Sequence, residues 1–198
     1  MKFRFILLVI EGGALAAMSI LVKRRKTKDF DRRWAESLDV SKRAPLSLGF
    51  AAEPSHLVLC SGVFALCCRQ LSTVERLALC IAPTIASTFG LGLKRTVPRE
   101  RPNKNRFNPT GGESYPSTHT ACSVALGLTA ADIARARGVG RWVWVLLVAW
   151  AALVARERVC EAAHWPSDVL GGAVLGALSW NLATLGLLRA AGESNHDR

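Results

Sequence analysis

Hydrophobic residues in this sequence gather into long runs, and short basic segments separate the runs. Two of the clearest are Leu77–Leu93, followed by Lys94, and Val169–Leu188, followed by Arg189. A helix of about 20 apolar residues is long enough to cross the hydrocarbon core of a bilayer. Several such runs that alternate with basic loops are typical of a multi-span membrane protein. The pattern therefore predicts an all-α fold, a bundle of transmembrane helices.

Other apolar runs raise the expected number of membrane segments to about six. Phe5–Val22 is predicted to be a retained helix, because the basic residues massed after it at Lys23–Lys26 argue against a cleaved signal peptide. Thr118–Ala134 and Trp142–Ala155 are two more segments of helix length. Leu57–Cys68 is too short to cross alone and would also need residues 51–56.

Residues 29–43 show a different pattern. Phe30, Trp34 and Leu38 recur at helical spacing among charged residues, which predicts an amphipathic helix in the membrane interface. The chain is thus divided into three parts. An N-terminal membrane helix and this interfacial segment occupy residues 1–54, the main membrane domain occupies residues 55–190, and a flexible polar tail occupies residues 191–198.

The chain is strongly basic, with 26 Lys and Arg against 15 Asp and Glu and a net charge of +11. This balance suits a nucleic-acid binder, or loops that lie against anionic lipid headgroups. The uncharged run Val169–Leu188 has no use in a nucleic-acid binder, so we expect membrane lipids and no nucleic acid as partners. The six cysteines show no Cys-x-x-Cys spacing, which gives a zinc or disulfide framework little support.

Polar residues suited to chemistry stand at the ends of the apolar segments. Counting spans places the loop of residues 94–118 and the loop of residues 156–168 on the same side of the membrane, because two spans separate them. Side chains from both loops can therefore converge on one site.

The first of these loops carries two candidate phosphate ligands, Lys94 and Arg101. Pro98 lies between them and interrupts any continuing helix, so we expect the two cations on a helix end and on a stiff loop folded back over it. Two such cations suit a tetrahedral oxyanion, to which arginine offers a bidentate fork.

The same loop ends in Tyr-Pro-Ser-Thr-His, residues 115–119. Ser117 suits the N-cap of the next helix, whose free backbone N–H groups form an anion site. His119 in that first turn could donate a proton to a leaving oxygen. A capped helix with an incidental histidine would also explain this segment, taken by itself.

The second loop carries Arg158, His164 and Asp168, with Pro166 at the expected first position of the last helix. Asp168 would then hold one nitrogen of His164 and leave the other as a nucleophile, which is the arrangement that nucleophilic catalysis requires. Arg158, one short loop earlier, can reach the same anion.

Together these residues resemble the signature of the type 2 phosphatidic acid phosphatase (PAP2) superfamily, in its membrane lipid-phosphatase branch. That signature is Lys-x6-Arg-Pro, then Pro-Ser-Gly-His, then Ser-Arg-x5-His-x3-Asp. The resemblance covers residues 55 to 188 and departs at two positions, with Thr118 in place of Gly and Glu157 in place of Ser. The matching residues, in the family's order and spacing, are Lys94, Arg101, Pro102, Pro116, Ser117, His119, Arg158, His164 and Asp168.

The resemblance implies a phosphatase, a hydrolase of phosphoric ester or anhydride bonds, that forms a phosphohistidine at His164. Asp168 would stabilise the cationic intermediate, and His119 would protonate the leaving group and then activate water. No metal and no cofactor is expected, because cationic side chains would take the role of a metal. The residues that would bind the phosphoryl oxygens are Lys94, Arg101, Ser117, Thr118 and Arg158.

Several alternatives stay open. Phosphatidate-type glycerolipids and polyprenyl phosphates or diphosphates are equally good substrate classes. A phosphotransferase using the same intermediate, or a catalytically silent membrane scaffold, would also keep this fold. With the N-terminus inside and six spans, the site would open on the external or periplasmic face of the cell membrane. The same topology places the basic residues 23–33 outside, against the positive-inside tendency.

Overall fold

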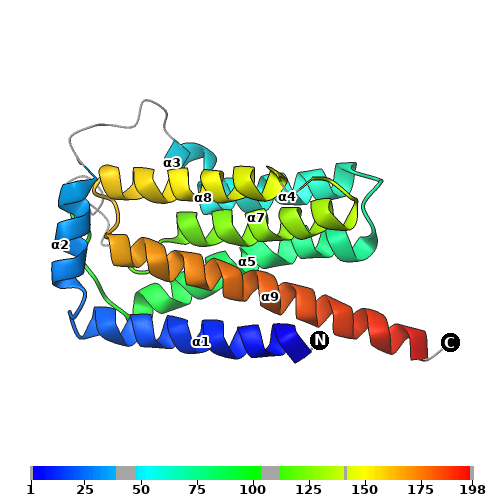
Figure 1. Ribbon diagram of the computed structural model, residues 1–198, viewed down its shortest axis with the longest axis horizontal. Helices are drawn as coiled ribbons and strands as arrows, with labels where there is room; N and C mark the ends of the chain where they lie inside the picture. Colours follow the sequence, from blue (N-terminus) through cyan, green and yellow to red (C-terminus); the bar gives the residue numbers. More distant parts are fainter. Residues whose placement is uncertain (1, 39–47, 104–111, 141, 197–198) are drawn as a thin grey trace.

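The computed structural model describes residues 2–38, 48–103, 112–140 and 142–196, which form eight helices and no strand. Apart from α2 and α3, the helices run side by side along the long axis, and α2 lies across one end of the bundle (Figure 1). The all-α prediction is confirmed for the described part of the chain. The helices are α1 (Lys2–Lys23), α2 (Lys28–Ser37), α3 (Leu48–Ala51), α4 (Pro54–Cys67), α5 (Thr73–Thr96), α7 (Thr118–Ala136), α8 (Trp142–Cys160) and α9 (Pro166–His196).

Three helices are long and apolar enough to cross a membrane by length and composition: α1, α5 and the Pro166–Arg189 part of α9. Helix α4 is apolar but has only 14 residues, and α7 and α8 have 19 each. Large apolar side chains are exposed on the outward faces of α1, α4, α5 and α8, as lipid contact requires, including Phe5, Val9, Phe64, Phe89, Val145 and Leu146. The total of about six spans remains a prediction.

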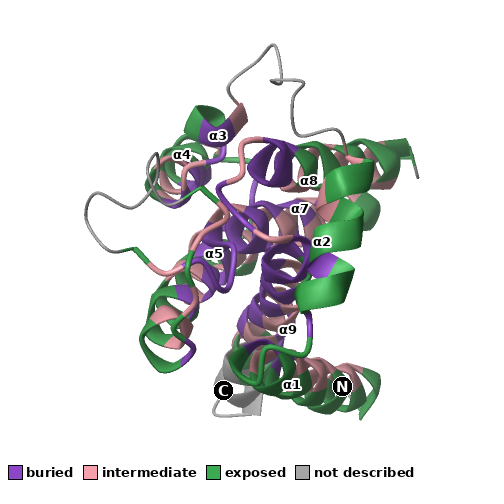
Figure 2. Ribbon diagram, turned by 90° about the vertical axis from the view of Figure 1, so that its left-hand side faces the viewer, coloured by how far each residue is buried: buried purple, intermediate pink, exposed green. Residues whose placement is uncertain are grey.

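Small residues bring α9 close to α7 and thereby fix the start of both helices. A Cβ atom at Gly172 would lie 2.4 Å from the Ser117 carbonyl oxygen, and one at Gly176 would lie 2.5 Å from the Ala121 carbonyl oxygen. Gly171 likewise makes room for the ring of Tyr115. Such close approach of helix backbones is what small residues allow in membrane bundles. Figure 2 shows the result, with burial concentrated in α7 and α9 and exposed residues on the surrounding helices.

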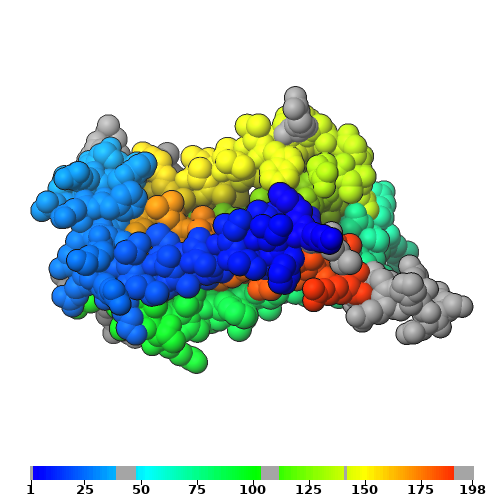
Figure 3. Space-filling view, turned by 60° about the horizontal axis from the view of Figure 1, so that its bottom comes forward, coloured from blue at the N-terminus to red at the C-terminus, as the bar shows by residue number. Residues whose placement is uncertain are grey.

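Helix α1 lies along the outside of the bundle (Figure 3) and is attached by polar side chains near its N-terminal end. Arg4 pairs with Asp132 of α7 at 2.7 Å and donates a hydrogen bond to Asn181 of α9 at 3.2 Å. Asn181 donates in turn to Glu11 at 3.0 Å. The two carboxylates inside apolar segments therefore have partners on other helices, as intramembrane charges require.

Three helix boundaries differ from the sequence-based expectation. Helix α8 continues to Cys160, so Arg158 lies in its last turn and not in a loop. Helix α9 continues to His196, beyond the expected start of the flexible tail at residue 191. The interfacial helix spans Lys28–Ser37, with Phe30 and Trp34 exposed as an interfacial helix requires, whereas residues 39–43 of the predicted segment lie outside the described residues.

Candidate active site

The predicted site residues meet at the end of the bundle where α5 and α8 end and α7 and α9 begin (Figure 1). The two loops that were expected on the same side contact each other there. The backbone N–H of Asn103 donates to the Ala162 carbonyl oxygen at 3.0 Å, and Arg101 Nη1 donates to the Ala163 carbonyl oxygen at 3.0 Å. The predicted convergence of the two loops is confirmed.

His164 is almost fully buried, with 2% of its surface exposed. Its Nδ1 atom lies 2.8 Å from the Ser114 carbonyl oxygen. A carbonyl can only accept, so Nδ1 carries the proton and Nε2 keeps its lone pair. Burial lowers the pKa of His164 to about 4, with Asp168 opposing and Lys94 and Arg101 contributing. At neutral pH the ring is therefore neutral, with Nε2 available as a nucleophile.

Asp168 is placed differently from the expectation. Its Oδ2 atom lies 3.8 Å from His164 Nδ1, too far for a hydrogen bond. Oδ2 instead accepts a very short hydrogen bond from the Ser114 hydroxyl and one of 2.8 Å from the Trp165 backbone N–H. Ser114 thus stands between the two residues, its hydroxyl on Asp168 and its carbonyl on His164. Sequence reasoning missed Ser114 because its backbone oxygen, which no motif specifies, contacts the histidine.

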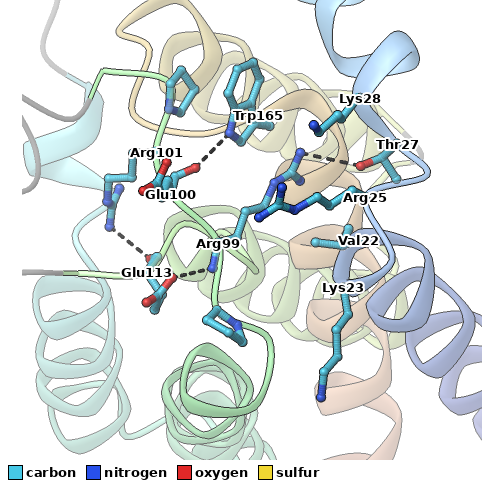
Figure 4. A pocket seen from close by; sticks show the side chains of 12 residues that line it. Val22, Lys23, Arg25, Thr27, Lys28, Arg99, Glu100, Arg101, Glu113 and Trp165 are labelled. Carbon is cyan, nitrogen blue, oxygen red and sulfur yellow. Dashed lines mark hydrogen bonds between the residues drawn. The ribbon is translucent and has the colours of Figure 1, made fainter.

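Arg99 is a second residue that the sequence did not single out. Its Nη1 atom donates to Asp168 Oδ1 at 2.6 Å and to Ser167 Oγ at 2.7 Å. Its Nη2 atom forms a short ion pair with Asp31 of α2, a carboxylate that is only 1% exposed. Figure 4 shows the side chains of Arg99 and Trp165. The Cζ atom of Arg99 lies over the Trp165 ring, 5.5 Å from its centroid.

Asp31 also completes the start of α9. Its Oδ1 atom accepts from the Ser167 backbone N–H at 2.8 Å, and Oδ2 accepts from the Ser167 hydroxyl at 2.9 Å. Helix α2 therefore provides a carboxylate to the first turn of the helix that carries Asp168, where an anion is stabilised by free N–H groups. Asp31 is one of three acidic residues in Lys28–Ser37, and nothing in the sequence distinguishes it from the other two.

Lys94 and Arg101 converge as predicted, and both bind the backbone of residues 112–114. Lys94 Nζ donates to the Glu113 carbonyl oxygen at 2.7 Å. Arg101 Nε donates to the Gly112 carbonyl oxygen at 3.2 Å, and its Nη1 atom lies 3.4 Å from His164 Nε2. Burial lowers the pKa of Arg101, although Asp168 opposes this effect. A cation is thus placed beside the nucleophilic nitrogen.

Ser117 is the N-cap of α7, as the sequence predicted, and its hydroxyl accepts from the Thr120 backbone N–H at 3.5 Å. In the described part of the chain, the N–H groups of Thr118 and His119 donate to no protein group. The Thr118 side chain packs towards α5, where a Cβ atom at Gly90 would lie 2.6 Å from Thr118 Cγ2. Gly90 therefore makes room for the threonine, which leaves the backbone of this turn open to an anion.

His119 lies across the site from His164, with 6.5 Å between the ring centroids. Its Nε2 atom contacts Glu53 Oε2 at 2.9 Å, and its Nδ1 atom is buried without a partner among the described residues. The hydrogen bond from His119 is the main reason that the pKa of Glu53 lies below its ordinary value. Glu53 immediately precedes α4 and belongs to no motif, so the sequence did not reveal it.

Arg158 is brought close to the site, but carboxylates hold its guanidinium. Nη2 lies 2.5 Å from Glu161 Oε2 and 3.5 Å from Glu157 Oε2, and the side chain is buried. Gly49 of α3 packs against this guanidinium, since a Cβ atom at position 49 would lie 1.9 Å from Nη2. Glu157, the second departure from the family pattern, thus partly neutralises a predicted phosphate ligand.

No group of three or more His, Cys, Asp and Glu side chains that could hold a metal ion occurs among the residues that the structure describes. The site is instead built from two histidines, three arginines and a lysine around the first turns of α7 and α9. Such an arrangement can hold a phosphoryl group by its oxygens while an imidazole nitrogen attacks the phosphorus.

The chain is similar in sequence to two curated lipid phosphatases. An undecaprenyl-diphosphatase of Sulfolobus acidocaldarius is 33% identical over 111 residues, which cover 52% of this chain and 50% of that protein. A lipid A 4'-phosphatase of Bacteroides thetaiotaomicron is 29% identical over 120 residues, which cover 51% of each chain. The chain therefore spans about half the length of the curated relatives that it matches.

Two solved structures have the same fold at 20% identity. The transmembrane PAP2 type phosphatidylglycerolphosphate phosphatase of Bacillus subtilis superposes with a TM-score of 0.69, covering 90% of this chain and 94% of that one. LpxE of Aquifex aeolicus superposes with a TM-score of 0.57, covering 76% and 92%. With the apolar helices, these neighbours show that the chain is a membrane protein. The sequence profile of the PAP2 superfamily matches residues 75–190, more than half of the chain, and the protein belongs to this superfamily.

Proposed function

We propose that this protein is a membrane phosphatase that releases phosphate from a lipid phosphate or diphosphate through a phosphohistidine at His164. The observation that carries the proposal is the state of His164. Its ring is buried, its Nδ1 proton is committed to the Ser114 carbonyl, and its Nε2 atom lies 3.4 Å from Arg101 Nη1. A phosphoryl group bound by Arg101 would therefore lie next to the nucleophile.

In the first step, the Nε2 lone pair attacks the phosphorus, and the bond from phosphorus to the leaving oxygen breaks. His119 delivers the proton that the leaving oxygen takes up. Lys94, Arg101 and the free N–H groups of Thr118 and His119 neutralise the charge on the phosphoryl oxygens. Preorganised donors of this kind supply most of the stabilisation in phosphoryl transfer.

The intermediate is an imidazolium that carries phosphate on Nε2 and a proton on Nδ1. The Nδ1 proton keeps its hydrogen bond to Ser114, and the Asp168 carboxylate, 3.8 Å from Nδ1, stabilises the positive ring. In the second step, His119 accepts a proton from water, the resulting hydroxide attacks phosphorus, and the bond from phosphorus to Nε2 breaks. Inorganic phosphate leaves and His164 returns to its neutral form.

A lipid substrate is supported by an apolar groove of about 290 Å³ between α7, α8 and α9. Thr120 and Val169 line the groove, and they are close in sequence to Ser117 and Asp168 respectively. A hydrocarbon chain in this groove would leave its phosphate near the site. The similar proteins, an undecaprenyl-diphosphatase and a lipid A 4'-phosphatase, are also named for action on lipid-linked phosphates.

We further propose that the site opens on the external or periplasmic face of the cell membrane. The start of α1 and the site lie at opposite ends of the bundle (Figure 1), as a cytoplasmic N-terminus with an external site requires. Labelling of intact cells with a membrane-impermeant lysine reagent tests this, since the lysines at the site end should react and Lys2, at the start of α1, should not.

The function is tested by measuring phosphate release from phosphatidate, phosphatidylglycerophosphate and polyprenyl diphosphate by the purified protein in detergent with EDTA. His164→Ala should abolish release, and His56→Ala, a histidine outside the site, should retain it. Equal rates in wild type and His164→Ala would instead favour a silent scaffold. Transfer of phosphate to an added alcohol in preference to water would identify a phosphotransferase.

A further inference from the structure

A basic pocket of about 500 Å³ lies beside the site, between the turn that joins α1 to α2 and the loop that follows α5 (Figure 4). Five cationic side chains line it, against the two carboxylates of Glu100 and Glu113. Glu113 is already engaged, because its carboxylate accepts a short hydrogen bond from the Arg99 backbone N–H. The five cations are Lys23, Arg25, Lys28, Arg99 and Arg101.

Three of these cations have no protein partner among the described residues. Arg99 and Arg101 are bonded to protein groups, whereas Lys23, Arg25 and Lys28 form no ion pair and no side-chain hydrogen bond with any residue in the described ranges. Three unpaired cations on one cavity repel each other and are stabilised by a bound anion.

The turn between α1 and α2 directs these side chains. Arg25 has a φ angle of +57°, a left-handed conformation that is uncommon for a residue other than glycine. The turn is closed by hydrogen bonds from the Lys26 N–H to the Leu21 carbonyl and from the Arg25 N–H to the Val22 carbonyl, both 2.9 Å. Within this basic segment, Lys23, Arg25 and Lys28 line the pocket, whereas Arg24 and Lys26 do not.

The pocket shares a wall with the reaction centre. Arg101 lines the pocket, and its Nη1 atom lies 3.4 Å from His164 Nε2. Arg99, on the same wall, holds Asp168. Arg101 therefore belongs both to the lining of the pocket and to the immediate surroundings of His164 Nε2.

From this arrangement we infer that the basic pocket binds a second phosphate group of the lipid substrate. This inference rests on the proposed phosphatase function and narrows the substrate class. The preferred headgroup carries two phosphates, either as a diphosphate or as a phosphomonoester beside a phosphodiester. One phosphate reacts at His164, and the other is neutralised by Lys23, Arg25 and Lys28.

The test compares polyprenyl diphosphate with polyprenyl monophosphate of the same chain length. The pocket variant combines Lys23→Gln, Arg25→Gln and Lys28→Gln. Its matched control combines Arg24→Gln, Lys26→Gln and Arg33→Gln, which remove the same charge from exposed positions of the same segment outside the pocket.

We expect the pocket variant to lose at least about tenfold in kcat/KM on the diphosphate, through KM, and less than about threefold on the monophosphate. The control should lose less than about threefold on both. The inference would be overturned if the pocket variant lost equal kcat/KM on the two substrates, or if the two variants lost equal kcat/KM. Either result would mean that the basic segment acts only through its overall positive charge.

Two further measurements distinguish failure of the pocket inference from failure of the proposed function. If the wild-type protein releases no phosphate, binding of inorganic pyrophosphate is measured by titration calorimetry, and the pocket variant should bind at least about tenfold more weakly than the control. Equal affinities would overturn the pocket as an anion site. Phosphatidylglycerol added to the monophosphate assay should have no effect, since a stimulation that only the pocket variant loses would assign the pocket to a neighbouring lipid's phosphate.

Discussion

The two histidines of the site are held in very different ways. His164 is 2% exposed, and the groups around it form a continuous network through Ser114, Asp168, Arg99 and Asp31. The His119 side chain is 16% exposed. Among the described residues its ring nitrogens have one polar partner, Glu53, whose side chain is 45% exposed.

This difference matches the two tasks in phosphoryl transfer. A nucleophile must keep one tautomer and one direction of attack, which a buried network enforces. A general acid and base must exchange protons with a departing oxygen and then with water, which requires an accessible ring. The contrast predicts that substitutions around His164 lower kcat far more than substitutions around His119.

The largest effect is expected from Asp168→Asn. An amide cannot balance the charge of Arg99 or of the phosphorylated imidazolium, and it replaces one of the two acceptor oxygens of Asp168 with a donor. We expect kcat to fall by at least about a thousandfold. Steady-state kinetics measures this, with thermal unfolding to verify the fold. A loss of less than tenfold in a folded variant would show that Asp168 does not support the nucleophile.

Asp31→Asn and Arg99→Leu test the extension of the network into α2. Both act through Asp168, so on a lipid monophosphate, which has no second phosphate for the basic pocket, we expect kcat to fall about 10- to 100-fold with little change in KM. The double variant should lower kcat little more than the worse single variant does, because the two residues act as one unit. Asp29→Asn, on the exposed side of α2, is the control and should change kcat less than twofold. If the losses in kcat were additive, Asp31 would not act through the hydrogen-bond network of Arg99 and Asp168.

The pKa of His164 gives a pH test of the same contrast. The folded-state pKa of about 4 lies below the ordinary value of about 6.5, so the ring stays neutral as the pH falls through that window. The acid limb of kcat/KM that belongs to the nucleophile should therefore lie near pH 4. A limb near 6.5 would reduce activity about 30-fold at pH 5 and would contradict the burial argument.

The same shift makes folding sensitive to acid. Between pH 6.5 and 4 the unfolded chain binds a proton at His164 that the folded chain does not, so stability falls as the pH falls. The thermal midpoint should decline over this window in wild type and decline less in His164→Ala.

A smaller effect is expected from Glu53→Gln, on the exposed side of the site. Losing one partly exposed carboxylate should reduce kcat by less than about tenfold near neutral pH. Steady-state kinetics of the variant measures this loss. A loss as large as that of Asp168→Asn would remove the contrast between the two histidines.

The sequence predicted the helical fold and the convergence of the two loops. The apolar runs indicate the helices, and the number of runs between two polar loops indicates whether these loops lie at the same end. It also placed the N-cap at Ser117 and the start of the last helix at Pro166. It did not predict the partners of the site residues. Ser114 acts through a backbone carbonyl, and Asp31 and Glu53 come from segments distant in sequence, so no local spacing encodes these contacts.

The expected position of Asp168 in the first turn of the last helix placed its carboxylate directly on His164, and the structure shows why this is incomplete. The first turn of α9 positions the Asp168 carboxylate by bonds to Trp165 and Arg99, and Ser114 fills the space between it and the imidazole. Similarly, Arg158 was expected to be open to an anion, whereas Glu157 and Glu161 hold it. Pairing of this kind depends on side-chain packing that spacing alone does not specify.

The most direct test of the central claim is to trap the phosphoenzyme. His119→Ala is mixed with a lipid labelled in the reacting phosphate and quenched in alkali, which preserves phosphohistidine, and the labelled peptide is identified by mass spectrometry. The account predicts label on Nε2 of His164, a longer lifetime of the labelled enzyme than in wild type because water is no longer activated, and no label in the double variant that also carries His164→Ala. Label elsewhere, or turnover by the His164→Ala protein at the wild-type rate, would contradict it.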